Sequence, residues 1–139
     1  MSVLVREGVV EADDLVFEEL YDDLTGQLIQ VRLSGNVTCY SGAKVRVLKW
    51  METRARDGGV EVLTVFYQYQ AWLPRVGRRR EQPLVRYDQA HGGQPHRHEF
   101  DPLGKDVAHQ NLTFETMPRL DAVIREAAGL AAAFDSDPR

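Results

Sequence analysis

The feature of this sequence that most constrains its fold is a residue pattern with a period of two, which is clearest in VEVLTVFYQYQAWL at 60–73. Successive side chains of a β-strand point to opposite faces of the sheet, so every second residue shares a face. Phe66 and Trp72 fall on one face of this segment. The other face carries a continuous apolar and aromatic set: Leu63, Val65, Tyr67, Tyr69 and Ala71. A strand with bulky residues on both faces is expected at the centre of a sheet that is covered on at least one side.

Further strands are predicted on both sides of this segment. The sequence alternates over about 28–40 and 43–54, and the RDGG stretch at 56–59 is a turn signal between alternating segments. Two shorter strands, 84–89 and 96–101, follow a loop that contains Pro74, Gly77 and Pro83. Because the connections are short, we expect an antiparallel sheet over residues 28–101.

Two helices are predicted outside this sheet. In the C-terminal segment 116–134, Thr116 is placed to cap a helix and Pro118 lies in its first turn. Its apolar residues recur at steps of three and four and form one stripe that needs a sheet face to cover: Leu120, Val123, Ile124, Ala127, Ala131 and Phe134. A short acidic amphipathic helix is predicted near the N-terminus, over residues 11–21.

Together these elements predict one α+β domain over residues 1–139, a length that supports a single core. It consists of an antiparallel β-meander of four to six strands with the C-terminal helix packed on one face. An acidic N-terminal segment, residues 1–25, includes the short helix.

The formal net charge of −4 is unevenly distributed along the chain. Residues 1–25 hold eight acidic residues and one basic residue, whereas residues 26–139 hold 16 basic and 13 acidic residues. The acidic segment is either a solvated face or a shield for a basic surface that would otherwise bind phosphate.

Cysteine content and hydropathy indicate the compartment. The one cysteine, Cys39, excludes an internal disulfide and favours a reducing compartment, and it is expected to be a small, partly buried apolar residue. The sequence has neither a membrane-length apolar run nor a signal-peptide pattern. We therefore expect a cytoplasmic protein without membrane contact.

The stretch VRYDQAHGGQPHRHEFD at 85–101 holds three of the four histidines. If it forms a β-hairpin, Arg86 and Asp88 share one face of the first strand, and His96 and His98 share one face of the second. Two such imidazoles can act as general acid and general base on a phosphodiester. Asp88 would then orient one ring, while Arg86 and His91 would position the phosphate. This reaction needs no metal and no cofactor.

Two other interpretations of the same residues stay open. In a metal-dependent hydrolase or nuclease, His96, His98 and Asp88 would be the ligands, with His91 or Glu99 as other choices for the third. Alternatively, the stretch is a polar hairpin of a protein-interaction module with no catalytic activity. The pairing register of the two strands decides whether His96 and His98 share a face with Arg86 and Asp88. A slip of one residue turns all side chains of one strand to the opposite face.

Arginines near this stretch suggest a contact with a nucleic-acid backbone. Four of them lie in the loop before the hairpin and one lies within it: Arg75, Arg78, Arg79, Arg80 and Arg97. The neighbouring aromatic residues Tyr67, Tyr69 and Trp72 either stack bases or pack within the sheet.

The order of these segments resembles the TumE-like family of small toxins from bacterial toxin–antitoxin modules. In that family an aromatic Y-x-Y strand, an R-Y-D segment, a PH-x-H strand and a final helix follow one another. The residues that carry the resemblance here are Tyr67, Tyr69, Arg86, Tyr87, Asp88, His91, Pro95, His96 and His98. The loop QAHGGQ at 89–94 is shorter than the usual proline-rich loop of the family.

This resemblance implies a cytoplasmic toxin that acts on RNA and is bound by an antitoxin protein. Combined with the histidine pair, it predicts an RNA-cleaving protein that uses histidine acid–base chemistry. The sequence is also compatible with a homodimer.

Overall fold

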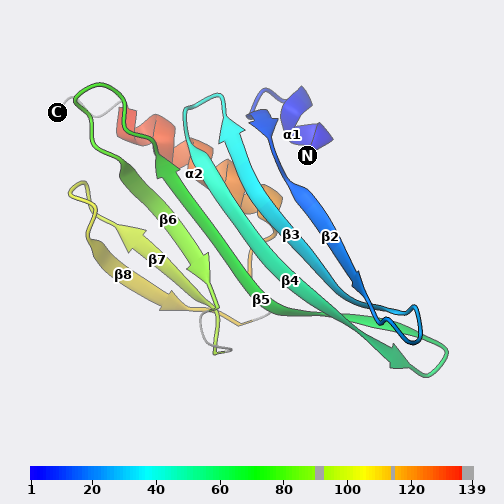
Figure 1. Cartoon of the computed structure of the whole chain (residues 1–139). Helices are drawn as coiled ribbons and strands as arrows, with labels where there is room; N and C mark the ends of the chain where they lie inside the picture. Colours follow the sequence, from blue (N-terminus) through cyan, green and yellow to red (C-terminus); the bar gives the residue numbers. More distant parts are fainter. Residues whose placement is uncertain (90–92, 114, 136–139) are drawn as a thin grey trace.

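A computed structural model describes residues 1–89, 93–113 and 115–135. Its elements follow in this order: α1 (Ser2–Arg6), β1 (Val10–Asp13), β2 (Val16–Tyr21), β3 (Leu28–Cys39), β4 (Lys44–Arg56), β5 (Gly59–Leu73), β6 (Gln82–Asp88), β7 (His96–Phe100), β8 (Asp106–Asn111) and α2 (Leu120–Asp135). The eight strands form one antiparallel sheet, and α2 crosses one of its faces (Figure 1).

The sheet is a meander, since each strand from β3 to β8 pairs with its neighbour in sequence. The alternating strands predicted over 28–101 are all present, with bounds that differ from the predicted ones by a few residues. The α+β class and the antiparallel meander are therefore confirmed. Eight strands form instead of the predicted four to six, because strands were missed at both edges of the sheet.

The acidic helix predicted over residues 11–21 is wrong. This segment forms β1 and β2, which both pair with β3, while the N-terminal helix is α1 over residues 2–6. The chain passes from β1 to β2 directly over Gly35, where a Cβ atom would lie 2.7 Å from the carbonyl oxygen of Asp14. Gly35 also has φ of +139°, so a side chain there is excluded both by its backbone conformation and by space.

The core lies between the sheet and α2. Alternate residues along part of β4, β5 and β6 face the helix, and Tyr67, Ala71 and Val85 are fully buried there. The helix contributes the stripe that its periodicity predicts, since Val123, Ile124, Ala127 and Ala131 are at most 1% exposed. The prediction of a central strand that is covered on one face is confirmed for β5.

The start of α2 differs from the prediction. The helix begins at Leu120, and residues 116–119 precede it. The Thr116 hydroxyl accepts a hydrogen bond from the backbone N–H of Thr113 and so closes a local turn instead of capping α2. The short polar side chain of threonine hydrogen-bonds to nearby backbone in turns as readily as at helix starts, so composition alone did not separate the two.

Two smaller expectations can be compared with the fold. Cys39 is a free thiol that is 1% exposed within the core, as expected for a small apolar residue. Among the described residues, no helix is both long and apolar enough to cross a membrane.

Candidate functional site

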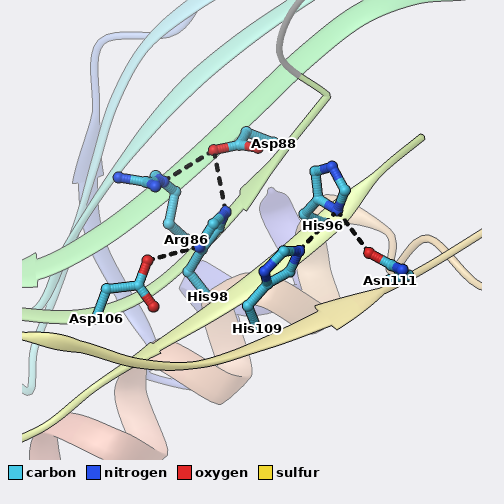
Figure 2. Close-up of polar contacts among 7 residues, drawn as sticks. All are labelled: Arg86, Asp88, His96, His98, Asp106, His109 and Asn111. Carbon is cyan, nitrogen blue, oxygen red and sulfur yellow. Dashed lines mark hydrogen bonds and ion pairs between the residues drawn. The ribbon is translucent and has the colours of Figure 1, made fainter. Parts of the chain in front are cut away.

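The site lies on the face of the sheet opposite α2, and the register of three strands builds it. Arg86 of β6 pairs with His98 of β7, and His98 pairs with His109 of β8. In the adjacent row, Asp88 pairs with His96, and His96 pairs with Asn111. The condition for a single site is therefore met, because the two predicted histidines share a face with Arg86 and Asp88. We call Arg86, Asp88, His96, His98, Asp106, His109 and Asn111 the histidine cluster (Figure 2).

His98 is held between two carboxylates. Its Nδ1 atom lies 2.7 Å from Oδ2 of Asp106, and its Nε2 atom lies 3.7 Å from Oδ2 of Asp88. The shorter contact has hydrogen-bond geometry and the longer one does not. A carboxylate at Nδ1 fixes the ring orientation and leaves Nε2 as the atom that exchanges a proton. Asp106 therefore orients His98, a role that the sequence analysis gave to Asp88.

His96 and His109 are in direct contact. Nε2 of His109 lies 3.2 Å from Nδ1 of His96, and Oδ1 of Asn111 lies 3.0 Å from the same Nδ1 atom. Within the part of the chain that the structure describes, the Nε2 atom of His96 makes no hydrogen bond to another side chain. The rings of His96 and His98 have their centroids 6.2 Å apart, and the ring of His109 lies 4.8 Å and 5.2 Å from them.

Arg86 and Asp88 form an ion pair beside the histidines. Nε of Arg86 donates to Oδ2 of Asp88 at 2.9 Å. The Asp88 side chain is 12% exposed and the Arg86 side chain 30%, so the carboxylate is largely covered and the guanidinium is still accessible. One face of the guanidinium therefore stays available for an anion, while the carboxylate offsets its charge.

The other predicted catalytic residue, His91, lies outside the described residues. His109 was not predicted, although it is the most exposed of the three clustered histidines and belongs to an edge strand. The turn signal at Pro102 and Gly104 could have revealed it, since a hairpin there brings the chain back beside β7. The pattern of β8 itself gave no indication, because all six of its residues are exposed.

The arginines predicted to contact nucleic acid divide into two groups. Arg75, Arg78, Arg79 and Arg80 lie in the β5–β6 loop, beyond the end of β6 that is farther from Asp88. Arg97 lies on the opposite face, where its Nε donates to the Tyr87 hydroxyl at 3.0 Å and its Nη2 lies 3.5 Å from Glu126 of α2. Tyr87 in turn donates to Glu126 at 2.9 Å, so Arg97 joins β6 and β7 to the helix.

The aromatic residues predicted either to stack bases or to pack also divide by face. Tyr67 and Tyr69 are buried against α2, and burial raises the pKa of Tyr69 to about 12. Trp72 is half-buried on the same face as the histidine cluster, with the guanidinium of Arg46 5.8 Å from its ring centroid. Tyr67 and Tyr69 thus pack in the core, and Trp72 is accessible from the side of the histidines.

Metal geometry and the position of the pockets bear on what this site can bind. Among the described residues, no group of three or more His, Cys, Asp or Glu side chains has the arrangement of a metal site. A pocket of about 650 Å³ lies on the other side of the sheet, between α1 and the start of α2, and is lined by no residue of the histidine cluster. A smaller pocket, of about 220 Å³, is lined by His109 of the cluster together with Arg97, Glu99, Ala108 and Gln110.

Comparisons of this chain with protein-family models, with curated protein sequences and with solved structures find no match. The resemblance to the TumE-like toxins therefore stays a prediction from the sequence.

Proposed function

We propose that this protein is a ribonuclease that cleaves RNA through its own 2′-hydroxyl group by histidine acid–base catalysis. The observation that carries the proposal is the histidine cluster itself. It places three imidazoles on one face of the sheet, with a carboxylate at Nδ1 of one of them and an arginine beside them. Cleavage of RNA at the 2′-hydroxyl needs a base, an acid and a cation for the phosphate.

The proposed mechanism assigns one proton transfer to each of two histidines. Nε2 of His98 takes the proton of the 2′-hydroxyl, and the resulting oxyanion attacks the adjacent phosphorus. The bond from phosphorus to the 5′-oxygen breaks, and protonated His96 gives its Nε2 proton to that oxygen. The products are a 2′,3′-cyclic phosphate and a 5′-hydroxyl.

Three further residues support these transfers. Asp106 stabilises His98 as it gains a proton, and Arg86 stabilises the negative charge that develops on the phosphate. His109 contacts Nδ1 of His96 and holds that ring in place. Because one histidine has to start neutral and the other charged, the rate is expected to be bell-shaped in pH.

The toxin role is the second part of the proposal, and it rests on the resemblance to the TumE-like family. In this role the protein acts on cellular RNA until an antitoxin protein binds and blocks it. Induced expression in a bacterial host is expected to arrest growth. The His96→Ala/His98→Ala variant is expected to leave growth unaffected at equal protein level.

The direct test is cleavage of a labelled single-stranded RNA by purified protein, with and without EDTA. Wild type is expected to cut in both conditions, and His96→Ala/His98→Ala is expected to be inactive in both. Cleavage that EDTA abolishes would replace the proposal by metal-dependent hydrolysis. Absence of cleavage by the wild type, or full activity of the double variant, would refute it.

A further inference from the structure

The face of the sheet opposite α2 carries a continuous row of polar and basic residues that leads away from the histidine cluster. Pairing across the strands aligns His109, His98, Arg86, Gln70 and Arg46, one from each of β8, β7, β6, β5 and β4. Adjacent strands lie about 4.8 Å apart, so the row spans about 19 Å. A short dinucleotide held at the histidines does not reach its far end.

Aromatic rings with an arginine guanidinium nearby lie beside this row, on the same face of the sheet. The guanidinium of Arg46 lies 5.8 Å from the ring centroid of Trp72, and that of Arg86 lies 5.9 Å from the ring centroid of Phe100. Farther along the sheet, the guanidinium of Arg32 on β3 lies 4.9 Å from the ring centroid of Trp50 on β4. Three separate pairs of an aromatic ring and an arginine therefore lie on the one sheet face that no helix covers.

Around Trp72 this face carries the positive charge of Arg46, which favours an anionic partner there. Farther along the sheet the register places Glu18 opposite Arg32 and Glu52 opposite Gln30, so the positive charge is confined to the Trp72 end of the face. Within the described part of the chain, Arg32 and Arg46 form no ion pair with a carboxylate, whereas Arg86 is paired with Asp88. Asp13 and Asp14 line a small pocket together with Lys44 at the β1 edge. The carboxylates of Asp13 and Asp14 would repel a polyanion from the β1 edge of the sheet.

We propose that this face binds single-stranded RNA, and that Arg46 and Trp72 contact the strand at a distance from the bond that is cut. The choice of RNA rests on the proposed function. The choice of a single strand rests on the aromatic rings, because the bases of a duplex are stacked on each other and offer no free face to Trp72. Arginines next to these rings supply the phosphate contacts, and the β5–β6 loop with Arg75, Arg78 and Arg80 continues beyond Trp72.

The test measures binding separately from cleavage. The probe is a fluorescein-labelled twelve-nucleotide single-stranded RNA of mixed sequence with 2′-O-methyl riboses, which lacks the hydroxyl needed for cutting. Fluorescence anisotropy gives its Kd for wild type, Arg46→Glu, Trp72→Ala and Trp72→Phe. Arg119→Glu is the matched control, since the Arg119 side chain is 90% exposed and precedes α2, on the other side of the sheet.

Arg46→Glu and Trp72→Ala are each expected to weaken binding about tenfold, in the range of one phosphate contact or one stacked base. Arg46→Glu is also expected to reduce the slope of log K against log salt by about 0.7. Trp72→Phe keeps an aromatic face and is expected to stay within about twofold of wild type, as is Arg119→Glu. Circular dichroism and thermal melting confirm that each variant is folded.

Several results would overturn the inference. Unchanged binding by both Arg46→Glu and Trp72→Ala would show that the strand does not cross this face. Equal affinity for a duplex of the same length would refute the preference for single strands, and absence of binding by the wild type would refute the inference as a whole.

Cleavage of a ribodinucleotide distinguishes this inference from the proposed function. Arg46→Glu is expected to cut the dinucleotide as fast as wild type, because that substrate is too short to reach position 46. Binding that depends on Arg46 and Trp72, without cleavage of any RNA, would support the inference and refute the ribonuclease. Cleavage of RNA, together with unchanged binding by Arg46→Glu and Trp72→Ala, would support the ribonuclease and refute the inference.

Discussion

The two carboxylates that flank His98 are expected to have different roles, and one pair of matched substitutions separates them. Oδ2 of Asp106 lies 2.7 Å from Nδ1 of His98, and its side chain is 42% exposed on an edge strand. Oδ2 of Asp88 lies 3.7 Å from Nε2 of His98 but 2.9 Å from Nε of Arg86, and its side chain is 12% exposed. Asp106→Asn and Asp88→Asn keep the shape of each side chain and remove its charge.

Asp106→Asn is expected to act on catalysis. A charge-assisted hydrogen bond contributes roughly 1.5–3 kcal/mol, and partial exposure of Asp106 reduces this to about 1 kcal/mol. Loss of that stabilisation of protonated His98 in the transition state lowers kcat/KM about fivefold. The melting temperature is expected to change little, because Asp106 is 42% exposed on an edge strand and water can replace its contact with His98.

Asp88→Asn is expected to act mainly on stability. Removing one partner of a fully buried ion pair costs about 3–5 kcal/mol, and the exposure of Arg86 reduces the cost to about 1–2 kcal/mol. An unfolding entropy of about 2.1 cal/mol/K per residue over 139 residues makes each 1 kcal/mol worth about 3.4 °C in Tm. The variant is therefore expected to melt about 3–7 °C lower than wild type.

Differential scanning calorimetry and steady-state cleavage of a ribodinucleotide measure the two quantities on the same protein samples. The reasoning would be refuted if Asp106→Asn left kcat/KM unchanged while Asp88→Asn reduced it with no loss of Tm. That result would return the orienting role to Asp88.

Further predictions follow from the core. Ile124→Ala removes a fully buried side chain of α2 and is expected to cost about 2–5 kcal/mol in urea unfolding, whereas Arg119→Ala on the exposed helix start is expected to change stability by less than about 0.5 kcal/mol. Burial raises the pKa of Tyr69 from its ordinary 10 to about 12. The unfolded chain therefore loses the Tyr69 proton at lower pH than the folded chain, and the free energy of unfolding falls as pH rises from about 10 to 12. Tyr69→Phe removes this group and is expected to show a smaller fall in Tm between about pH 9 and 11. Burial also raises the pKa of the Cys39 thiol, so iodoacetamide is expected to modify it slowly in the native protein and rapidly in guanidinium, and equal rates would contradict its place in the core.

The parts of the fold that were predictable are those with one buried and one accessible face. Strands β3 to β6 alternate where one face packs on α2, and the stripe of α2 repeats for the same reason. The acidic segment was misassigned because its apolar residues Leu15, Val16 and Leu20 fit a helical spacing, while nearly all of β2 is exposed and shows no clear alternation. Edge strands depend on pairing with a neighbour, which no local pattern reveals.

The candidate site was also predictable only where its residues lie on strands with a clear alternating pattern. Alternation placed Arg86 with Asp88 and His96 with His98, but only the register of β6 against β7 brought the two pairs together. His109, Asp106 and Asn111 arrive from β8, a strand without a burial pattern, so the sequence missed the residues that contact His98 and His96 most closely. Local alternation therefore identified the strands that hold the site, and long-range pairing completed it.

In the proposed reaction, RNA is cut by its own 2′-hydroxyl group. The most direct measurement uses a labelled DNA oligonucleotide that contains a single ribonucleotide, incubated with the purified protein in EDTA. We expect one cut, on the 3′ side of that ribonucleotide, with a 2′,3′-cyclic phosphate on the product. We expect no cut when the ribonucleotide is replaced by its 2′-deoxy form. Cutting of the all-DNA oligonucleotide, or no cut at the ribonucleotide, would contradict the proposed reaction.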